Sequence, residues 1–177
     1  MKRVNVKPDS LKDRNGQWLQ AHLASGHAVG QPILIAEDSE SDVFFMLRVM
    51  EQAGVLNPIF VVRDGNEALA YLQGTGKYAD RAVYPIPGIV LLDLKMPGVD
   101  GFDILRWRRN APQLQHTLVV AVSSFDGIYA INLAYETGAD TFLSKPLSAE
   151  DILNLITAFE NYWQLMQGTR AVAKSAV

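Results

Sequence analysis

The stretch that decides the fold is IVLLDLKMPGVDGF, which runs from Ile89 to Phe102. Four consecutive apolar residues lead directly into Asp93, and a Pro-Gly and an Asp-Gly pair follow within a few residues. A short apolar run bounded by turn residues is typical of a strand buried on both faces of a parallel sheet. Because this strand ends at a carboxylate, we expect Asp93 to lie at the edge of the sheet where ligands of such folds bind.

Four further apolar runs repeat this pattern, and segments with helical spacing separate them. The predicted strands are Ile33–Ala36, Pro58–Val62, Ile89–Leu92, Leu118–Val122 and Thr141–Leu143. One predicted helix begins at Ser39 or Ser41 and stops at Gly54, and the others are Asn66–Leu72, Phe102–Arg109, Ile128–Glu136 and Ala149–Met166. Regular alternation of strand and helix predicts a doubly wound α/β domain with a five-stranded parallel sheet.

Composition limits the class of protein. The chain has 177 residues, is 49% hydrophobic and 20% charged, and carries a net charge of −3. These values are those of an ordinary soluble globular protein and argue against nucleic-acid binding. Cysteine is absent, which suits a reducing cytoplasm and excludes disulfides and cysteine-bound metals. No apolar run approaches the roughly 18 residues of a membrane span.

The ends of the chain differ from its centre. Residues 1–30 carry five basic and two acidic side chains and are poor in aliphatic residues, so we interpret them as a flexible arm with a short helix near Leu11–Leu23. The domain proper is expected over residues 31–167, and residues 168–177 are expected to form a tail. Three arginines in LRWRRN, residues 105–110, are interpreted as the exposed face of a helix.

Polar side chains follow the predicted strands where each one ends. They are Glu37 and Asp38, Asp93, Ser123 and Ser124, and Lys145, from four separate strands. Carboxyl ends of parallel strands meet at one edge of a sheet, so these groups are expected to converge. Any one of them alone has an ordinary structural explanation as a turn or capping residue, and Ser124 is interpreted in that way. The combination in register favours a functional site.

The chemistry of the set is that of phosphoryl transfer. Three carboxylates packed together repel one another, so they should hold a cation or share a proton. An all-oxygen ligand set favours Mg²⁺, or Mn²⁺, over zinc. Asp93 would then attack phosphorus, Lys145 would neutralise phosphoryl oxygens, and Ser123 would donate a hydrogen bond to one of them.

These residues resemble the receiver domain of two-component response regulators over roughly residues 32–166. The resemblance implies strand order 2-1-3-4-5, a cis Lys145–Pro146 peptide bond, and Asp93 as the phosphoacceptor. It implies metal ligation by Glu37 through water, by Asp38 and Asp93, and by the backbone carbonyl of Lys95. It also implies that Ser123 and Phe142 act as switch residues, and that a sensor histidine kinase phosphorylates the chain. Lys95 and Phe125 depart from the commoner residues at their positions, which leaves the phosphate lifetime open.

An insertion from Gly74 to Pro87 resembles stand-alone regulators that pair with phytochromes, so a phytochrome-type photoreceptor kinase is the expected partner. Output is expected through a downstream protein, without nucleic acid or membrane. The aromatic end of the last helix, AFENYWQL, is either an intramolecular packing surface or a homodimer seam.

Two other functions stay open. A phosphorylation-independent adaptor could carry the same fold, and an aspartyl-phosphate phosphatase also uses an aspartate at a strand end. Such phosphatases resemble this chain less, because they carry a second aspartate where Lys95 stands. The expected protein is therefore not an enzyme toward a separate substrate: it catalyses only its own phosphorylation and dephosphorylation.

Overall fold

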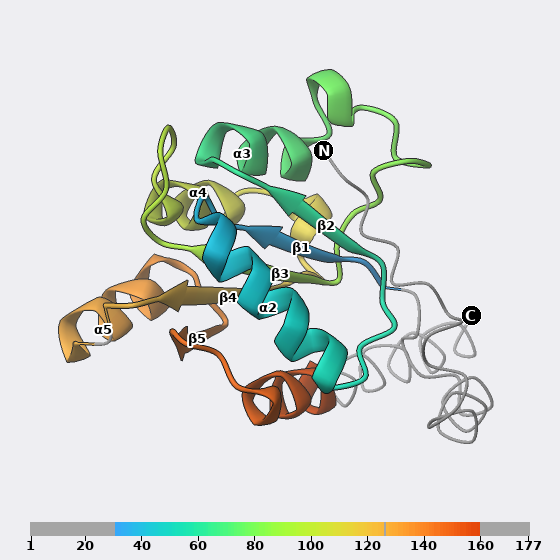
Figure 1. Ribbon diagram of the computed structural model, residues 1–177. Helices are drawn as coiled ribbons and strands as arrows, with labels where there is room; N and C mark the ends of the chain where they lie inside the picture. The colour runs from blue at the N-terminus through green and yellow to red at the C-terminus, as the bar shows by residue number, and fades with distance from the viewer. Residues whose placement is uncertain (1–30, 126, 160–177) are drawn as a thin grey trace, which may run out of the picture.

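The computed structural model describes residues 31–125 and 127–159. Its elements are, in chain order, β1 (Ile33–Ala36), α2 (Glu40–Gln52), β2 (Ile59–Val62), α3 (Gly65–Gln73), the 3₁₀ turn η2 (Gly76–Tyr78), β3 (Ile89–Asp93), α4 (Gly101–Arg108), the 3₁₀ turn η3 (Pro112–Leu114), β4 (Leu118–Ser123), α5 (Ile128–Thr137) and β5 (Thr141–Ser144) (Figure 1). A last helix covers residues 149–159 and continues to the limit of the described residues. Every predicted strand is present, and its ends lie within one residue of the prediction.

The five strands form one parallel sheet in the order β2-β1-β3-β4-β5, which confirms the expected order. The central strand β3 pairs with β1 on one side and β4 on the other, with Leu92 opposite Ala36 and Asp93 opposite Val122. All carboxyl ends therefore point to the same edge of the sheet. The alternating helices act as the crossovers that parallel strands require.

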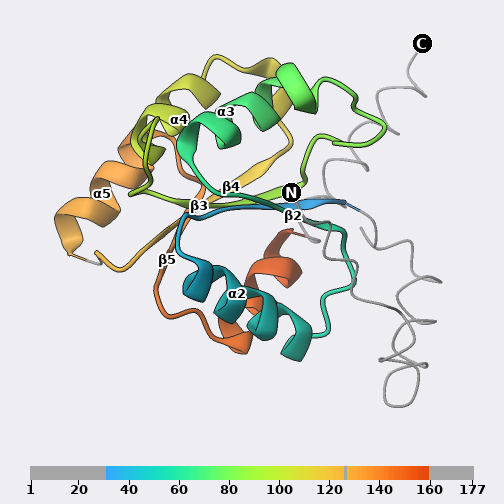
Figure 2. The same ribbon diagram turned by 45° about the horizontal axis from the view of Figure 1, so that its top comes forward.

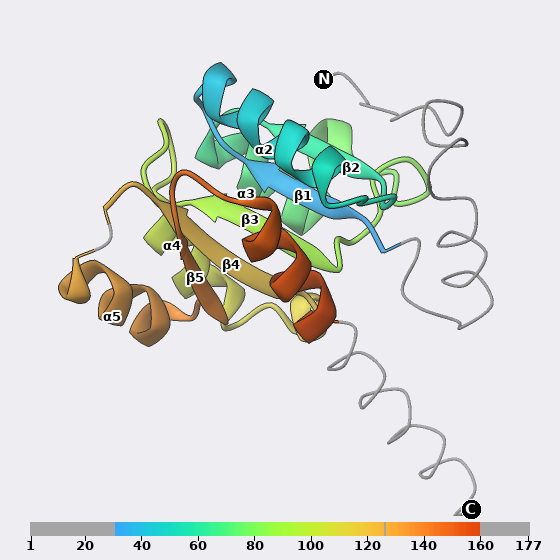
Figure 3. The same cartoon turned by 60° about the horizontal axis from the view of Figure 1, so that its bottom comes forward.

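Helices cover both faces of the sheet. Figure 2 shows α3, α4 and α5 on one face, with α2 and the helix of residues 149–159 on the other; Figure 3 shows that helix beside β5 and β4. Each face has its own apolar core, one built around Tyr71 and Leu105 and the other around Met46 and Ile152. The central strands are buried on both sides, which explains their uninterrupted apolar sequence.

Local capping fixes where the helices begin and end. Ser39, one of the two expected caps, is the N-cap of α2, and its hydroxyl accepts the backbone N–H of Asp42 at 3.2 Å. This helix ends at Gln52, and Gly54 follows in the left-handed region with a φ of 72°. Ser148 and Asp151 hydrogen-bond reciprocally at the start of the last helix, as a capping box does.

The last strand corrects one expectation. The sequence predicts that Thr141–Leu143 is buried on both faces, but residues 141–143 of β5 are half-buried and Ser144 is exposed. The reason is its position, because β5 lies at the edge of the sheet and pairs only with β4. Edge strands have a free side, which the apolar run by itself does not reveal.

The insertion between α3 and β3 folds onto the domain. Tyr71 and Tyr78 are both fully buried, and their ring centroids lie 5.1 Å apart. Arg81 reaches back and donates hydrogen bonds to the backbone carbonyls of Tyr71 and Leu72, at 2.8 and 2.9 Å, which satisfies carbonyl groups at the end of α3. The insertion is therefore an ordered part of the domain that caps α3.

Some expectations lie outside the described residues. They are the arm of residues 1–30 with its helix near Leu11–Leu23, the end of the last helix at Met166, most of the AFENYWQL segment and the tail of residues 168–177. In the described part of the chain, no helix combines the length and apolar character that a membrane crossing needs.

Candidate functional site

The strand ends place the polar residues at one edge of the sheet. Backbone pairing continues past the strands: the N–H of Glu37 donates to the carbonyl of Val62 at 3.1 Å, and the N–H of Lys145 donates to the carbonyl of Ser123 at 2.9 Å. Both residues are thus held in the sheet's register although they lie just beyond β1 and β5. The Lys145–Pro146 peptide bond is cis, as the resemblance implied.

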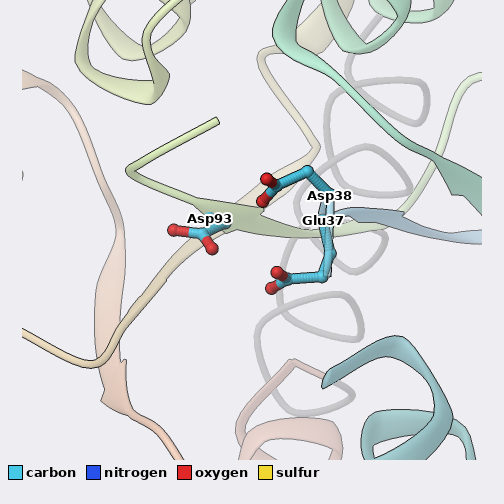
Figure 4. Close-up of side chains that lie close together, drawn as sticks. All are labelled: Glu37, Asp38 and Asp93. Carbon is cyan, nitrogen blue, oxygen red and sulfur yellow. The ribbon is translucent and has the colours of Figure 1, made fainter. Parts of the chain in front are cut away.

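Three carboxylates meet there. Glu37, Asp38 and Asp93 each offer an oxygen, and these oxygens all lie within 4.8 Å of one another. Figure 4 shows the three side chains leaving the ends of β1 and β3 toward the same side. Glu37 is 1% exposed and Asp93 is 7% exposed, whereas Asp38 faces solvent. Such an all-oxygen set fits a small divalent cation, with the exposed side open to water ligands.

Lys145 joins this group as its cation. Its Nζ lies 2.7 Å from Oδ2 of Asp93, 2.5 Å from Oε2 of Glu37 and 2.9 Å from Oδ2 of Asp42. The Lys145 side chain is only 11% exposed, so these charges face one another with little water between them. The expected convergence of Glu37, Asp38, Asp93 and Lys145 is confirmed as geometry, while the roles assigned to them stay predictions.

Asp42 is the partner that sequence reasoning missed. It lies in the first turn of α2, where an acidic residue already has a local explanation, because it favours the positive end of the helix dipole. A usable signal was nevertheless present: Asp42 follows the Glu37-Asp38 pair by about one helical turn and lies three residues after the cap at Ser39. A helix that starts at the edge of the sheet directs its first-turn side chains toward that edge.

One cation facing several carboxylates leaves excess negative charge. Burial, and to a smaller extent the neighbouring Asp93, raise the pKa of Glu37 to about 7, although the hydrogen bond from Lys145 opposes both effects. Burial alone would lower the pKa of Lys145. Its hydrogen bonds to Asp93, Glu37 and Asp42 outweigh that effect, so the pKa lies above its ordinary value and the ammonium stays charged.

The two predicted switch residues sit on neighbouring strands. Ser123 is buried at the end of β4, where its Oγ accepts the backbone N–H of Phe125 at 3.0 Å. Its own hydroxyl proton is free to be donated elsewhere, because a hydroxyl both donates and accepts. Phe142 is half-buried on β5 and packs against the core beneath α3, α4 and α5.

Lys95 occupies the loop after β3. Its backbone N–H donates to Oδ1 of Asp93 at 2.8 Å, so both carboxylate oxygens of Asp93 have partners. The Lys95 side chain is exposed, and its Nζ lies 4.4 Å from the ring centroid of Phe125. The metal-ligand role of its backbone carbonyl remains a prediction.

A pocket of about 290 Å³ opens beside Lys145. Its wall is formed by the first turns of α2 and by the loops that follow β4 and β5; the lining residues are Asp42, Phe45, Met46, Ser124, Lys145, Pro146 and Leu147. Ser124 is exposed in this wall, and its interpretation as a bystander stays a prediction. The pocket therefore opens next to Lys145 on the side of α2, and part of its lining is apolar.

Comparisons with known proteins agree with this geometry. The model of the response regulator receiver domain matches residues 33–157. Response regulator Rcp1 from Synechocystis sp. is 28% identical over 131 residues, covering 74% of this chain and 87% of Rcp1. A structure of Rcp1 in its Mn²⁺-bound form superposes with a TM-score of 0.60 at 28% identity, covering 75% of this chain and 94% of that one.

Two further structures come from phytochrome systems. The bacteriophytochrome response regulator RtBRR has a TM-score of 0.66 at 32% identity, covering 73% of this chain and 78% of its own. The phosphorylated cyanobacterial phytochrome response regulator RcpA has a TM-score of 0.63 at 27% identity, covering 76% and 94%. The matched family model spans well over half of the sequence, at the same residues that build the sheet and the acidic site. The chain therefore belongs to the response regulator receiver family and is related to the phytochrome response regulators.

Proposed function

We propose that the chain accepts a phosphoryl group on Asp93 from a sensor histidine kinase, with Mg²⁺ as the cofactor and Mn²⁺ as an alternative. The observation that carries this proposal is the pairing of Asp93 with Lys145 at 2.7 Å inside a cluster of three carboxylates. A nearly buried carboxylate at a strand end, beside a fixed ammonium and a cation site, is suited to attack a phosphorus centre.

The chain's own residues would divide the work. An oxygen of Asp93 forms a bond to phosphorus while the bond from phosphorus to the histidine nitrogen breaks, and that nitrogen keeps the electron pair. Lys145 is positioned to meet the arriving phosphoryl oxygens, since its Nζ already lies against Asp93. Ser123 donates its hydroxyl proton to another of these oxygens.

The metal would be held by Glu37, Asp38 and Asp93, with the Lys95 backbone carbonyl as a further ligand. When bound, it would offset the negative charge of the carboxylates and of the phosphoryl group. Donor chemistry supports this assignment, because the cluster offers carboxylate oxygens and has one solvent-facing member, Asp38, on the side where water ligands can enter. The Mn²⁺-bound form of the related Rcp1 is in agreement.

Signalling would follow from a local change of charge. A phosphoryl group at Asp93 draws the Ser123 hydroxyl toward it, and Phe142, on the neighbouring strand β5, repacks in response. The surface of α5, β5 and the last helix then changes its contacts with a downstream protein. The relatives named as phytochrome response regulators support a phytochrome-type kinase as the partner. We propose further that the protein acts in the cytoplasm and turns over no separate substrate. We include a homodimer among these contacts.

The proposal is tested by incubation of the purified chain with acetyl phosphate, a small-molecule phosphoryl donor, followed by intact mass measurement. We expect one phosphoryl adduct with Mg²⁺ and none with a chelator or in Asp93→Asn. The matched control is Asp100→Asn, an exposed aspartate that caps α4, which should be modified as the wild type is. If neither an adduct nor released phosphate appears, the phosphorylation-independent adaptor is favoured. If phosphate is released without an adduct, and is also released when other phosphate esters are offered, the phosphatase is favoured.

A further inference from the structure

Asp42 belongs to a closed ring of contacts at the start of α2. The Nζ of Lys145 lies 2.5 Å from Oε2 of Glu37 and 2.9 Å from Oδ2 of Asp42. The other oxygen of Glu37, Oε1, accepts the backbone N–H of Ser39 at 3.2 Å, and the Ser39 hydroxyl accepts the backbone N–H of Asp42. We call this set the α2 ring; its members are Glu37, Ser39, Asp42 and Lys145.

The ring fixes the position of the Asp42 carboxylate opposite the ammonium. Asp42 lies in the first turn of α2, and its backbone N–H is held by the N-cap residue Ser39, so it cannot shift without loss of the cap. Lys145 is held from the other side, because its own N–H donates to the carbonyl of Ser123 at 2.9 Å. Two segments that are 103 residues apart in the sequence thus bring this carboxylate and this ammonium together.

Asp42 differs from the other two carboxylates that pair with Lys145. Glu37 and Asp93 belong to the group of three carboxylates that fits a divalent cation, whereas Asp42 is not a member of that group. An ammonium has three N–H groups to donate, and Lys145 has three carboxylate partners. Asp42 is therefore the partner whose oxygens stay available to the ammonium when the other two carboxylates bind a metal.

We propose that Asp42 is a positioning residue that anchors the Lys145 ammonium to α2, so that the ammonium competes less with a divalent cation for the carboxylates of the site. This inference rests on the metal site of the proposed function. Its basis is electrostatic: without Asp42, the ammonium would concentrate its charge on Glu37 and Asp93, where it opposes the charge of a cation. Asp42 would therefore strengthen metal binding without being a metal ligand.

The expected effect is modest because Asp42 is partly exposed. Its side chain is 37% exposed, and an ion pair screened to this extent corresponds to about a two- to fivefold change in an equilibrium constant. Asp42→Asn keeps the shape of the side chain and removes its charge, so it should weaken Mn²⁺ binding about two- to fivefold. Asp42→Glu keeps the charge and should bind Mn²⁺ within about twofold of the wild type.

The experiment titrates the unphosphorylated chain with Mn²⁺ at pH 8 and measures the free ion by electron paramagnetic resonance. Circular dichroism first establishes that each variant is folded. The matched control is Glu40→Gln, which removes the other acidic side chain from the first turn of α2. Glu40 is not an ion-pair partner of Lys145 among the described residues, so this control should change the affinity by less than about 1.5-fold.

A double-variant cycle shows whether Asp42 acts through Lys145. Lys145→Met removes the competing ammonium and should bind Mn²⁺ more tightly than the wild type does. If Asp42 acts by holding that ammonium, Asp42→Asn added to Lys145→Met should change the affinity no more than the Glu40→Gln control does. If Lys145→Met does not fold, the three variants on α2 decide the question by themselves.

The outcomes separate the positioning role from a simple effect of charge. Weaker binding in Asp42→Asn, with recovery in Asp42→Glu and no matching loss in Glu40→Gln, supports the inference. Equal losses in Asp42→Asn and Glu40→Gln, an equal loss in Asp42→Glu, or the same loss with and without Lys145 would overturn it.

The proposed function can fail separately from this inference. If the wild type binds no Mn²⁺, the inference is overturned together with the proposed metal site. If the wild type binds Mn²⁺ and takes a phosphoryl group from acetyl phosphate, but Asp42→Asn binds the metal as the wild type does, then only the role of Asp42 is wrong.

Discussion

Replacing Lys145 by methionine tests the electrostatic account of the site directly. Methionine keeps the apolar stem and removes the only cation that, among the described residues, forms ion pairs with both Glu37 and Asp93. Loss of one partner from a buried ion pair costs about 3–5 kcal/mol. Asp42 adds little to this, because its side chain is 37% exposed and solvent screens it. At pH 8, without divalent metal, we expect a loss of about 3 kcal/mol in the free energy of unfolding.

The cost of Lys145→Met should depend on pH. The pKa of Glu37 is raised to about 7 in the folded protein, so Glu37 is mostly protonated at pH 5 and mostly ionised at pH 8. Lys145→Met also removes the hydrogen bond that lowers the pKa of Glu37, so Glu37 in the variant must keep an unfavourable proton or an unpaired charge at pH 8 but not at pH 5. The cost should therefore be smaller at pH 5 than at pH 8. Added Mg²⁺ should recover more stability in the variant than in the wild type, because it supplies the missing positive charge.

Urea unfolding at pH 5 and pH 8, with a chelator and then with Mg²⁺, measures these differences. The matched control is Lys95→Met, which removes an exposed lysine from the same edge of the sheet and should cost less than about 1 kcal/mol. Two results would refute the reasoning: a loss for Lys145→Met no larger than that of the control, or the same loss at both pH values.

Three further predictions concern the site and the elements that hold it. The pKa of Glu37 in the folded protein lies above its unfolded value, so the stability that protonated Glu37 contributes is lost as the pH rises toward 7. In metal-free urea unfolding, the free energy of unfolding of Glu37→Gln should therefore increase relative to that of the wild type between pH 5 and pH 8. A difference that does not change with pH would contradict this. Arg108→Lys loses the paired hydrogen bonds to the Asp140 carboxylate and should lower the free energy of unfolding by about 1.5–3 kcal/mol in the same assay; a loss under 0.5 kcal/mol would argue against it. Gly65→Ala would place a methyl group 1.7 Å from a backbone carbonyl oxygen and should lower the free energy of unfolding by about 3 kcal/mol or more. Gly127→Ala, with open space around it, should leave the melting temperature nearly unchanged. Similar shifts in melting temperature for both variants would be inconsistent with the packing described.

Much of the fold could be predicted because its signals are local. An apolar run such as Ile89–Leu92 needs no tertiary information to be assigned as a strand, and the glycines and serines beside the helices mark their ends. The convergence of Glu37, Asp93 and Lys145 could also be predicted, because parallel strands place their carboxyl ends together whatever the details of packing. Both inferences depend on periodicity and topology, which the sequence carries directly.

The misses share a different cause. Arg108 was expected on an exposed face of α4, but its side chain is only 16% exposed, and it donates hydrogen bonds to the carbonyls of Gly138 and Thr117 as well as to Asp140. Its partners lie 9 to 32 residues away in the sequence, so no local pattern announces them. Asp42 was missed for the same reason, because its partner Lys145 lies 103 residues away. Such contacts depend on how helices and strands pack against one another, whereas local sequence patterns show only where each helix or strand forms.

The shared cation at the site links these contacts to the proposed chemistry. Four carboxylates, Glu37, Asp38, Asp42 and Asp93, lie around the Lys145 ammonium, so the metal-free site carries surplus negative charge. This charge adds to burial, the main cause, in raising the pKa of Glu37. Conversion of a carboxylate into an aspartyl phosphate adds negative charge to this surplus. A bound divalent cation would reduce this surplus, so metal binding and the proposed phosphorylation would favour each other, and by linkage each would strengthen the other equally. In the proposed reaction, phosphorylation of Asp93 would therefore depend on the metal, because Lys145 supplies one positive charge beside four carboxylates.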